Sequence, residues 1–379
     1  ATTELSMKFI RIPGFVAAMA AACLCAACGK SSAPAAAAPA AGAIVVVDAG
    51  GRTVTLPAAP RRISVAGKAA FMIENAIYLF PEARQKGLAF LGGRFAQRAE
   101  AGDFLALVAP DRADRGAWGG ETGLEQIAAT QPDLVLMKNS APRAGDAVAG
   151  AGLPVVFLDF ETPAQYERDL AILGQVLAAT NRAAELIAYY RGVRTGVRAR
   201  TADLAAPDKP RTLLIQYADR GGARAFSVPP PNWIQTEMVE TAGGLPVWKD
   251  AAQPGGWTVV NLEQIAAWNP DVVLVVNYRG QAAPVVETLL NDPQWRTLRA
   301  AQARRIYAFP GDYCSWDQPD PRWGLGLLWT ATRLHPARFA DVDLEMEVFR
   351  FYALYGLAAA TVRERILPLI REDLAHVHN

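Results

Sequence analysis

The sequence predicts an α/β protein of two αβ lobes, with mostly parallel sheets, joined by a single long α-helix. Short apolar runs alternate with amphipathic stretches, which is typical of parallel strands covered by helices. One helix-Pro-Asp-strand unit occurs twice, and a long stretch with few helix breakers separates its two copies. The 379 residues are enough for about two domains at roughly 150 residues each.

Residues 1–28 read as a signal peptide with a lipobox-like end. Lys8 and Arg11 precede an apolar stretch at 15–24 that is too short to span a membrane, which takes about 20 residues. The following Leu-Cys-Ala-Ala-Cys-Gly at 24–29 is similar to a bacterial lipobox, which predicts lipidation of Cys28. Because the Leu lies four residues before Cys28 instead of the usual three, cleavage without a lipid is an alternative.

Residues 29–43 are rich in Ala, Pro and Ser, without charge or periodicity in their central part, and read as a tether. Three of the four Cys lie at the end of the signal peptide. If Cys28 is lipidated, Cys314 has no partner within the mature chain, so the core alone stabilises an exported protein.

The N-terminal αβ lobe is predicted over 44–165, with strands at the apolar runs 61–67, 133–137 and 154–158. The C-terminal αβ lobe is predicted over 205–379, with strands at 212–217, 271–276 and 305–309 and helices at its end. Leu-Glu-Gln-Ile-Ala-Ala occurs at both 124–129 and 262–267, each followed by Pro-Asp and a strand. This repeat indicates two lobes of similar plan; the alternative is two unrelated αβ corners.

The connecting helix is predicted over 166–204. Its apolar residues recur at helical spacing: Leu170, Leu173, Val176, Leu177, Ala184, Ile187 and Val193. Only Gly174, Gly192 and Gly196 interrupt it, each at a modest cost in helix stability. One long helix, or two joined helices, would therefore link the lobes.

Composition excludes several classes of function. With 38 Lys+Arg against 37 Asp+Glu the net charge is +1, which argues against nucleic-acid binding. Only three His occur, so no His-based metal site is expected. Nucleophile elbow, phosphate loop and dinucleotide fingerprint are all missing, so we expect neither an enzyme nor a cofactor. An αβ hydrolase or reductase and an adhesion lipoprotein are the competing classes.

Four segments in order along the chain carry a family resemblance: the opening at 47–54, the paired Leu-Glu-Gln-Ile units, Ala-Gly-Gly at 242–244, and Asp-Pro-Gln-Trp at 292–295 with 304–307. From about 45 to 367 the chain resembles helical-backbone (class III, iron-siderophore/vitamin B12 type) periplasmic substrate-binding proteins of ABC importers. Residues 314–329 resemble a subset linked to iron complexes, nickel or cobalt chelates, or molybdate and tungstate.

The resemblance implies a ligand cleft between the lobes, and an ABC importer permease with its ATPase as partners. It implies a monomer in the periplasm that touches the membrane only through an N-terminal lipid. The implied function is capture of a metal complex, a ferric siderophore or similar iron chelate first. Vitamin B12, haem, a nickel or cobalt chelate, and molybdate or tungstate are alternatives.

Two acidic residues match the positions that dock this family onto its permease. They are Glu125 and Glu263, the Glu of each repeated unit. Two separated carboxylates facing two basic sites would fix the orientation of the complex. Alternatively, both are ordinary helix-start acids favoured by the helix dipole.

Ligand residues are predicted from the positions that follow the strands, because ligands of αβ lobes bind beyond the carboxyl ends of parallel strands. Aromatic faces suit aryl-bearing chelates, and cations suit their negative charge. The candidates are Lys68, Arg94, Trp118, Asn139 and Ser140 in the first lobe, and Tyr217, Trp233, Tyr278, Arg279, Tyr313 and Trp316 in the second.

Some candidates have an equally simple structural interpretation. Trp316 could be a core residue at the lobe interface, Arg279 a solvated loop charge, and Tyr217 a cap on the core. His335 reads as a surface residue at a helix end, and Cys314 as a small buried apolar residue, so neither is expected to bind a metal.

Overall fold

The computed structural model describes residues 42–67, 69–91, 101–110, 123–140, 142–220 and 223–375. These residues all belong to one compact unit, Pro39–Asn379. Cys28, Lys68, Arg94 and Trp118 lie outside the described residues.

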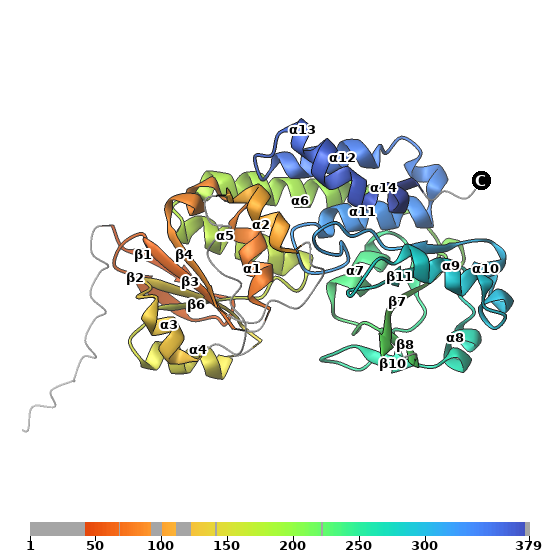
Figure 1. Cartoon of the computed structure of the whole chain (residues 1–379), viewed down its shortest axis with the longest axis horizontal. Helices are drawn as coiled ribbons and strands as arrows, with labels where there is room; N and C mark the ends of the chain where they lie inside the picture. Colours follow the sequence, from red (N-terminus) through yellow and green to blue (C-terminus); the bar gives the residue numbers. More distant parts are fainter. Residues whose placement is uncertain are drawn as a thin grey trace, which may run out of the picture. The chain divides into compact units, whose positions relative to one another are not determined.

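The first lobe is built on a four-stranded parallel sheet (Figure 1). Its order is β4 (Gly87–Leu91), β3 (Arg62–Ala66), β5 (Leu134–Lys138) and β6 (Val155–Leu158). A separate hairpin of β1 (Ile44–Val47) and β2 (Thr53–Leu56) precedes it. All residues of β5 and β6 are buried, as their continuous apolar runs predict.

Helices cover both faces of this sheet. On one face Ile127 of α3 (Leu124–Ala129) and Val148 of α4 (Pro142–Gly150) pack with Val135, Met137 and Phe157. The other face joins the main core, which includes α1 (Ala70–Ile77), α2 (Ala101–Val108) and α5 (Pro163–Val176).

The predicted connecting segment forms two helices, α5 and α6 (Thr180–Thr201). Ala178 has a φ of 55°, and the amide of Ala179 donates to the carbonyl of Gly174 at 2.7 Å. This is a Schellman ending, here with Ala in the left-handed position that Gly usually takes. A Cβ on Gly174 would lie 2.4 Å from the Cβ of Ala183, so this Gly lets α5 and α6 cross closely.

The long helix α6 contacts both the first lobe and the C-terminal part of the chain. Arg182, in its first turn, donates to the carbonyls of Leu79 in the first lobe (3.0 Å) and Leu354 near the C-terminus (2.5 Å). Further along, the Tyr190 hydroxyl donates to the carbonyl of Pro321 at 2.7 Å. The helix therefore links the two lobes through hydrogen bonds as well as packing.

The second lobe has a mixed sheet with the order β10-β8-β7-β11-β12, and β9 pairs with β7. The bounds are β7 (Arg211–Arg220), β8 (Ala223–Val228), β9 (Leu245–Pro246), β10 (Thr258–Val260), β11 (Val272–Val276) and β12 (Ile306–Ala308). β7, β11 and β12 are parallel, whereas β8 runs antiparallel to both β7 and β10. Strands β8 and β10 were not predicted, because each lacks a continuous apolar run of sufficient length.

Figure 1 draws the helices of this lobe in colours from green to blue, with the last of them in the blue C-terminal layer. They are α7 (Ile234–Thr241), α8 (Leu262–Trp268), α9 (Ala283–Asn291), α10 (Arg299–Gln302), α11 (Trp323–Leu334), α12 (Leu344–Ala353), α13 (Ala359–Thr361) and α14 (Leu367–Ala375). Short 3₁₀ turns lie at η1 (Pro81–Gln85), η3 (Ala206–Asp208), η4 (Trp295–Thr297) and η5 (Pro336–Phe339), and a π turn at η6 (Val362–Ile366). None of the helices in the described ranges is both long and apolar enough to cross a membrane.

Candidate functional site

Three half-buried rings form a continuous aromatic patch (Trp233, Trp257 and Tyr278) in the second lobe. The ring centroids of Trp233 and Trp257 are 6.0 Å apart, and those of Trp257 and Tyr278 are 5.9 Å apart, both edge-to-face. Tyr278 lies two residues beyond the carboxyl end of β11, where αβ lobes bind ligands. Trp257 directly precedes β10 and was not among the predicted residues.

Local structure holds Trp233 in place. It follows Pro229, Pro230 and Pro231, and its carbonyl accepts from the amide of Glu237 in the first turn of α7 at 3.1 Å. The stiff proline segment and the helix start together fix the backbone that carries this ring.

The hydroxyl of Tyr278 points inward. It donates to Oδ2 of Asp317 at 2.6 Å, and Gln235 Nε2 donates to the same oxygen at 3.2 Å. The Ser315 hydroxyl donates to Oδ1 at 2.6 Å. Burial raises the pKa of Tyr278 well above its usual value, and burial also raises the pKa of Asp317, which these three hydrogen bonds oppose.

Arg279 follows the patch in sequence and is exposed. Its amide donates to Oδ1 of Asn277 at 3.1 Å, which shapes the turn after β11. Its guanidinium forms no ion pair with any of the described residues. Its side chain is therefore a solvated cation that follows Tyr278 directly in the sequence.

Three other predicted residues of this lobe make their observed contacts with residues outside the aromatic patch. The ring of Tyr217 packs 6.1 Å from that of Phe226. Tyr313 is buried; its hydroxyl donates to the carbonyl of Arg365 at 3.2 Å, and its ring lies 5.6 Å from Phe104. Trp316 is fully buried and donates from Nε1 to Asp312 Oδ2 at 3.1 Å. Its side chain is enclosed because it fills the core of the loop.

The loop at 309–322 is buried throughout and, although it belongs to the second lobe, it also contacts the first lobe. Arg322 pairs with Asp312 at 2.6 Å and with Asp320 at 2.7 Å, with no side chain exposed. Burial alone would lower the pKa of Arg322, but the two carboxylates raise it well above its usual value. Asn75 of α1 donates to Asp320, and Phe104 of α2 stacks 4.3 Å from the guanidinium carbon of Arg322.

In the first lobe, Asn139 is half-buried at the end of β5, and its Nδ2 donates to the carbonyl of Ala49 at 3.4 Å. The preceding Lys138 was not predicted. Its side chain is only 2% exposed, and its ammonium lies 2.6 Å from Glu161 and also donates to the carbonyl of Asp159. A charge as the last residue of an otherwise apolar strand was the available signal in the sequence.

The two repeated Glu residues lie at matching helix starts. Glu125 and Glu263 are each the second residue of a helix, α3 and α8, and both are exposed. In α8, Asn261 Oδ1 accepts from the Gln264 amide at 2.8 Å, and Gln264 Oε1 accepts from the Asn261 amide at 3.0 Å. This capping box explains the repeated Gln, and leaves each Glu free of a role in the cap.

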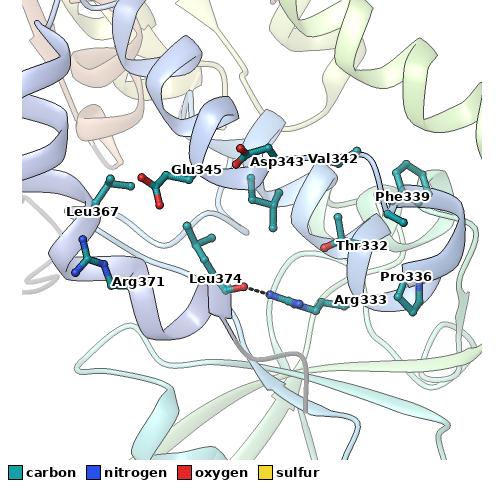
Figure 2. A pocket seen from close by; sticks show the side chains of 12 residues that line it. Thr332, Arg333, Pro336, Phe339, Val342, Asp343, Glu345, Leu367, Arg371 and Leu374 are labelled. Carbon is teal, nitrogen blue, oxygen red and sulfur yellow. Dashed lines mark hydrogen bonds between the residues drawn. The ribbon is translucent and has the colours of Figure 1, made fainter. Parts of the chain in front are cut away.

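A hollow with a volume of about 420 Å³ lies between α11, η5, α12 and α14 (Figure 2). Figure 2 shows Arg333 donating to the carbonyl of Leu374, at 2.6 Å; it also donates to that of Asp373 at 3.2 Å. The guanidinium of Arg333 is already hydrogen-bonded to two carbonyls, and no strand end lines the hollow. We therefore favour the aromatic patch over this hollow as the ligand site.

His335 and Cys314, which were not expected to bind a metal, make contacts within the second lobe. The Nε2 of His335 lies 3.1 Å from the carbonyl of Gly243, so the side chain links α11 to the loop after α7. Cys314 is buried and its thiol lies 3.6 Å from Gln318 Oε1. In the part of the chain that the structure describes, no three His, Cys, Asp or Glu residues are grouped to hold a metal ion.

Comparison with known proteins places the chain in a family. The model of the periplasmic binding protein family matches residues 116–313, which is more than half of the chain, so the chain belongs to this family. Members are substrate-binding proteins of ABC importers, not enzymes, and act in the periplasm. This confirms the predicted family.

Individual relatives bind different ligands. The molybdate-binding protein MolA of Haemophilus influenzae is 26% identical over 253 residues, 60% of this chain and 68% of the relative. Its molybdate-bound structure has a TM-score of 0.66 at 22% identity, covering 83% of this chain and 98% of that one.

Two further structures share the fold. A periplasmic solute-binding protein of Veillonella parvula has a TM-score of 0.68 at 20% identity, covering 88% and 98% of the two chains. The triscatecholate siderophore-binding protein FeuA of Bacillus subtilis, in complex with ferri-bacillibactin, has a TM-score of 0.53 at 15% identity, covering 78% and 99%. These likenesses confirm the predicted two-lobe α/β fold.

Proposed function

We propose that this protein captures a metal chelate with aromatic or apolar surface, a ferric siderophore or similar iron chelate first, and delivers it to the permease of its ABC importer. The aromatic patch is the observation that carries the proposal. Its three rings are half-buried and arranged edge-to-face beyond the carboxyl end of β11. Such rings offer a large, rigid apolar surface to the flat faces of a chelate.

The orientation of Tyr278 supports a large ligand over a small oxyanion. Its hydroxyl proton is donated to Asp317, so Tyr278 offers a ligand its ring and not a hydrogen-bond donor; among the three rings, only Trp233 and Trp257 carry an N–H that can face a ligand. The exposed Arg279 supplies positive charge next to the rings, which suits an anionic chelate.

Molybdate is the second candidate, because the curated relative MolA is a molybdate-binding protein. Tungstate, vitamin B12, haem and nickel or cobalt chelates are compatible with the same fold and role. For an oxyanion, donors such as Arg279 and Asn139 would have to dominate over the aromatic patch.

Docking is proposed through Glu125 and Glu263. The exposed positions of both residues at equivalent helix starts would give the permease two separated carboxylates. We further propose a monomer anchored through a lipid on Cys28 and the tether at 29–43, with lobes over 44–165 and 205–379.

Intrinsic Trp fluorescence of the exported chain carrying Cys28→Ser tests the ligand. The panel holds ferric siderophores, haem, vitamin B12, nickel–histidine and molybdate. Saturable quenching by ferric siderophores alone is the expected result. Quenching by molybdate alone would replace the first candidate with the second, and silence across the panel would place the ligand outside metal complexes and oxyanions.

A further inference from the structure

Asp317 lies in the buried loop at 309–322, yet it contacts the aromatic patch. We propose that Asp317 is a positioning residue of the ligand site: it fixes the ring of Tyr278 in the patch and connects that ring to the loop that joins the lobes. This inference rests on the proposed function, since it concerns the same site.

The hydrogen bonds around Asp317 come from three different segments. Tyr278 follows β11, Gln235 belongs to α7, and Ser315 belongs to the loop itself. The shortest bonds, both 2.6 Å, come from Tyr278 and Ser315. The carboxylate therefore ties the turn after β11 to α7 and to the loop, and the phenol oxygen of Tyr278 has one defined position.

Asp317 differs from the other carboxylates of this loop in its hydrogen-bond partners. Asp312 and Asp320 share the guanidinium of Arg322. Asp317 is fully buried, and among the described residues it forms no ion pair and is held by neutral donors alone. A buried carboxylate without a cation costs stability compared with an apolar residue of similar size. The presence of a carboxylate at this position is therefore better explained by its role in orienting Tyr278 than by a gain in stability.

The position of Tyr278 matters for the patch. Its backbone belongs to the turn after β11, and its ring is half-buried against the core, so the hydrogen bond to Asp317 adds a directional constraint to this packing. Trp257 meets the ring at 72°, and rotation of the phenol would break this edge-to-face contact. Three residues along the loop, Asp320 accepts from Asn75 of the first lobe. A ligand that touches Tyr278 is thus connected by one hydrogen bond to the loop that holds the other lobe.

The test uses the full chain labelled with 3-fluorotyrosine, without ligand. The ¹⁹F resonance of Tyr278 is assigned by its loss in Tyr278→Phe. Asp317→Asn keeps the shape of the side chain, and we expect it to shift the Tyr278 resonance. Asp219→Asn is the matched control, because Asp219 accepts from Tyr217 at 3.4 Å outside the patch; it should leave Tyr278 unchanged. An unmoved Tyr278 resonance in Asp317→Asn overturns the proposal.

Ligand affinity gives a second arm. With a ferric siderophore, Asp317→Asn and Tyr278→Phe should each weaken binding roughly tenfold, and the double variant no more than either alone. Additive losses would mean that Asp317 does not act through Tyr278. If Asp317→Asn does not fold, a crystal structure of Tyr278→Phe decides: a displaced ring supports the role of the hydrogen bond, and an unmoved ring overturns it. Absence of any ligand binding by the unchanged protein refutes the proposed function and leaves the NMR arm intact.

Discussion

Arg322 and Asp312 form an ion pair with 2.6 Å between Nε and Oδ1, and neither side chain has any solvent exposure. The same guanidinium contacts Asp320, whose other oxygen accepts from Asn75 of the first lobe. The loop at 309–322, in which the sequence predicted two ligand residues, therefore also holds the buried ion pairs of the interface between the lobes.

Replacing Arg322 by Met should destabilise the protein by about 3–5 kcal/mol, because two buried carboxylates lose their cation. Guanidinium denaturation of the two proteins measures the difference. Arg200→Met is the control: Arg200 pairs with the largely exposed Asp341, so its loss should cost about 1 kcal/mol or less. Equal stability of the two variants would contradict a structural role for the buried pair.

Removing a ring from the aromatic patch should weaken chelate binding without unfolding the protein. Trp233→Ala and Trp257→Ala are each expected to lower the affinity for the chelate roughly tenfold, because each substitution removes an aromatic surface that the ligand would contact. Trp268→Ala is the control, because this half-buried Trp ends α8, away from the patch. Fluorescence or calorimetric titration checks the affinities; an equal loss in all three would argue against a site at these rings.

Reversing both repeated acids should separate binding from transport. The double variant Glu125→Arg, Glu263→Arg should bind ligand with unchanged affinity but support no uptake, because both carboxylates offered to the permease are replaced by cations. Uptake of labelled ligand in cells measures this. Glu287→Arg, at an exposed position of α9, changes the charge in the same way and should leave uptake intact. Normal uptake by the double variant would refute docking.

Two glycines in helices should respond in opposite directions to Ala. A Cβ on Gly326 would lie 2.3 Å from the carbonyl oxygen of Trp316, so Gly326→Ala should destabilise by about 1–3 kcal/mol. A Cβ on Gly192 in α6 meets nothing within 4 Å, so Gly192→Ala should stabilise by about 0.5–1 kcal/mol. Thermal unfolding compares them, and a tolerated Gly326→Ala would show that α11 can shift away from the loop.

The stability of the protein should depend on His335 at mildly acidic pH. Burial lowers the pKa of His335 below 6.5, and the nearby Arg338 and Arg305 lower it further. The unfolded chain therefore binds the proton more readily, and the free energy of unfolding should fall as pH decreases below about 6.5. Denaturation of the wild type and His335→Gln at several pH values measures the slope, which should be shallower in the variant. Equal slopes would exclude His335 as its source.

Sequence patterns predicted six strands that pair in parallel, β3, β5, β6, β7, β11 and β12, and the repeated helix starts, but not β4. Residues 133–137 and 271–276 form β5 and β11 to within a residue, because continuous apolar runs of this length need cover on both faces. The end of α5 was not localised, because Ala178 adopts the left-handed conformation without a Gly to mark it. Trp316 and Trp233 look alike as loop aromatics, yet one is enclosed and the other half-buried.

By itself the sequence determined the two-lobe α/β plan and the family, since hydrophobic periodicity and the order of short motifs are local properties of the chain. Only the tertiary structure decided which aromatic residues form one surface. Trp257 joins Trp233 and Tyr278 because β10 pairs with β8 and brings distant segments together. Tyr313 and Trp316 do not belong to that surface, because the loop that carries them is buried around the ion pairs of Arg322 with two carboxylates. Contacts between segments far apart in the chain cannot be inferred from the spacing of residues within either one.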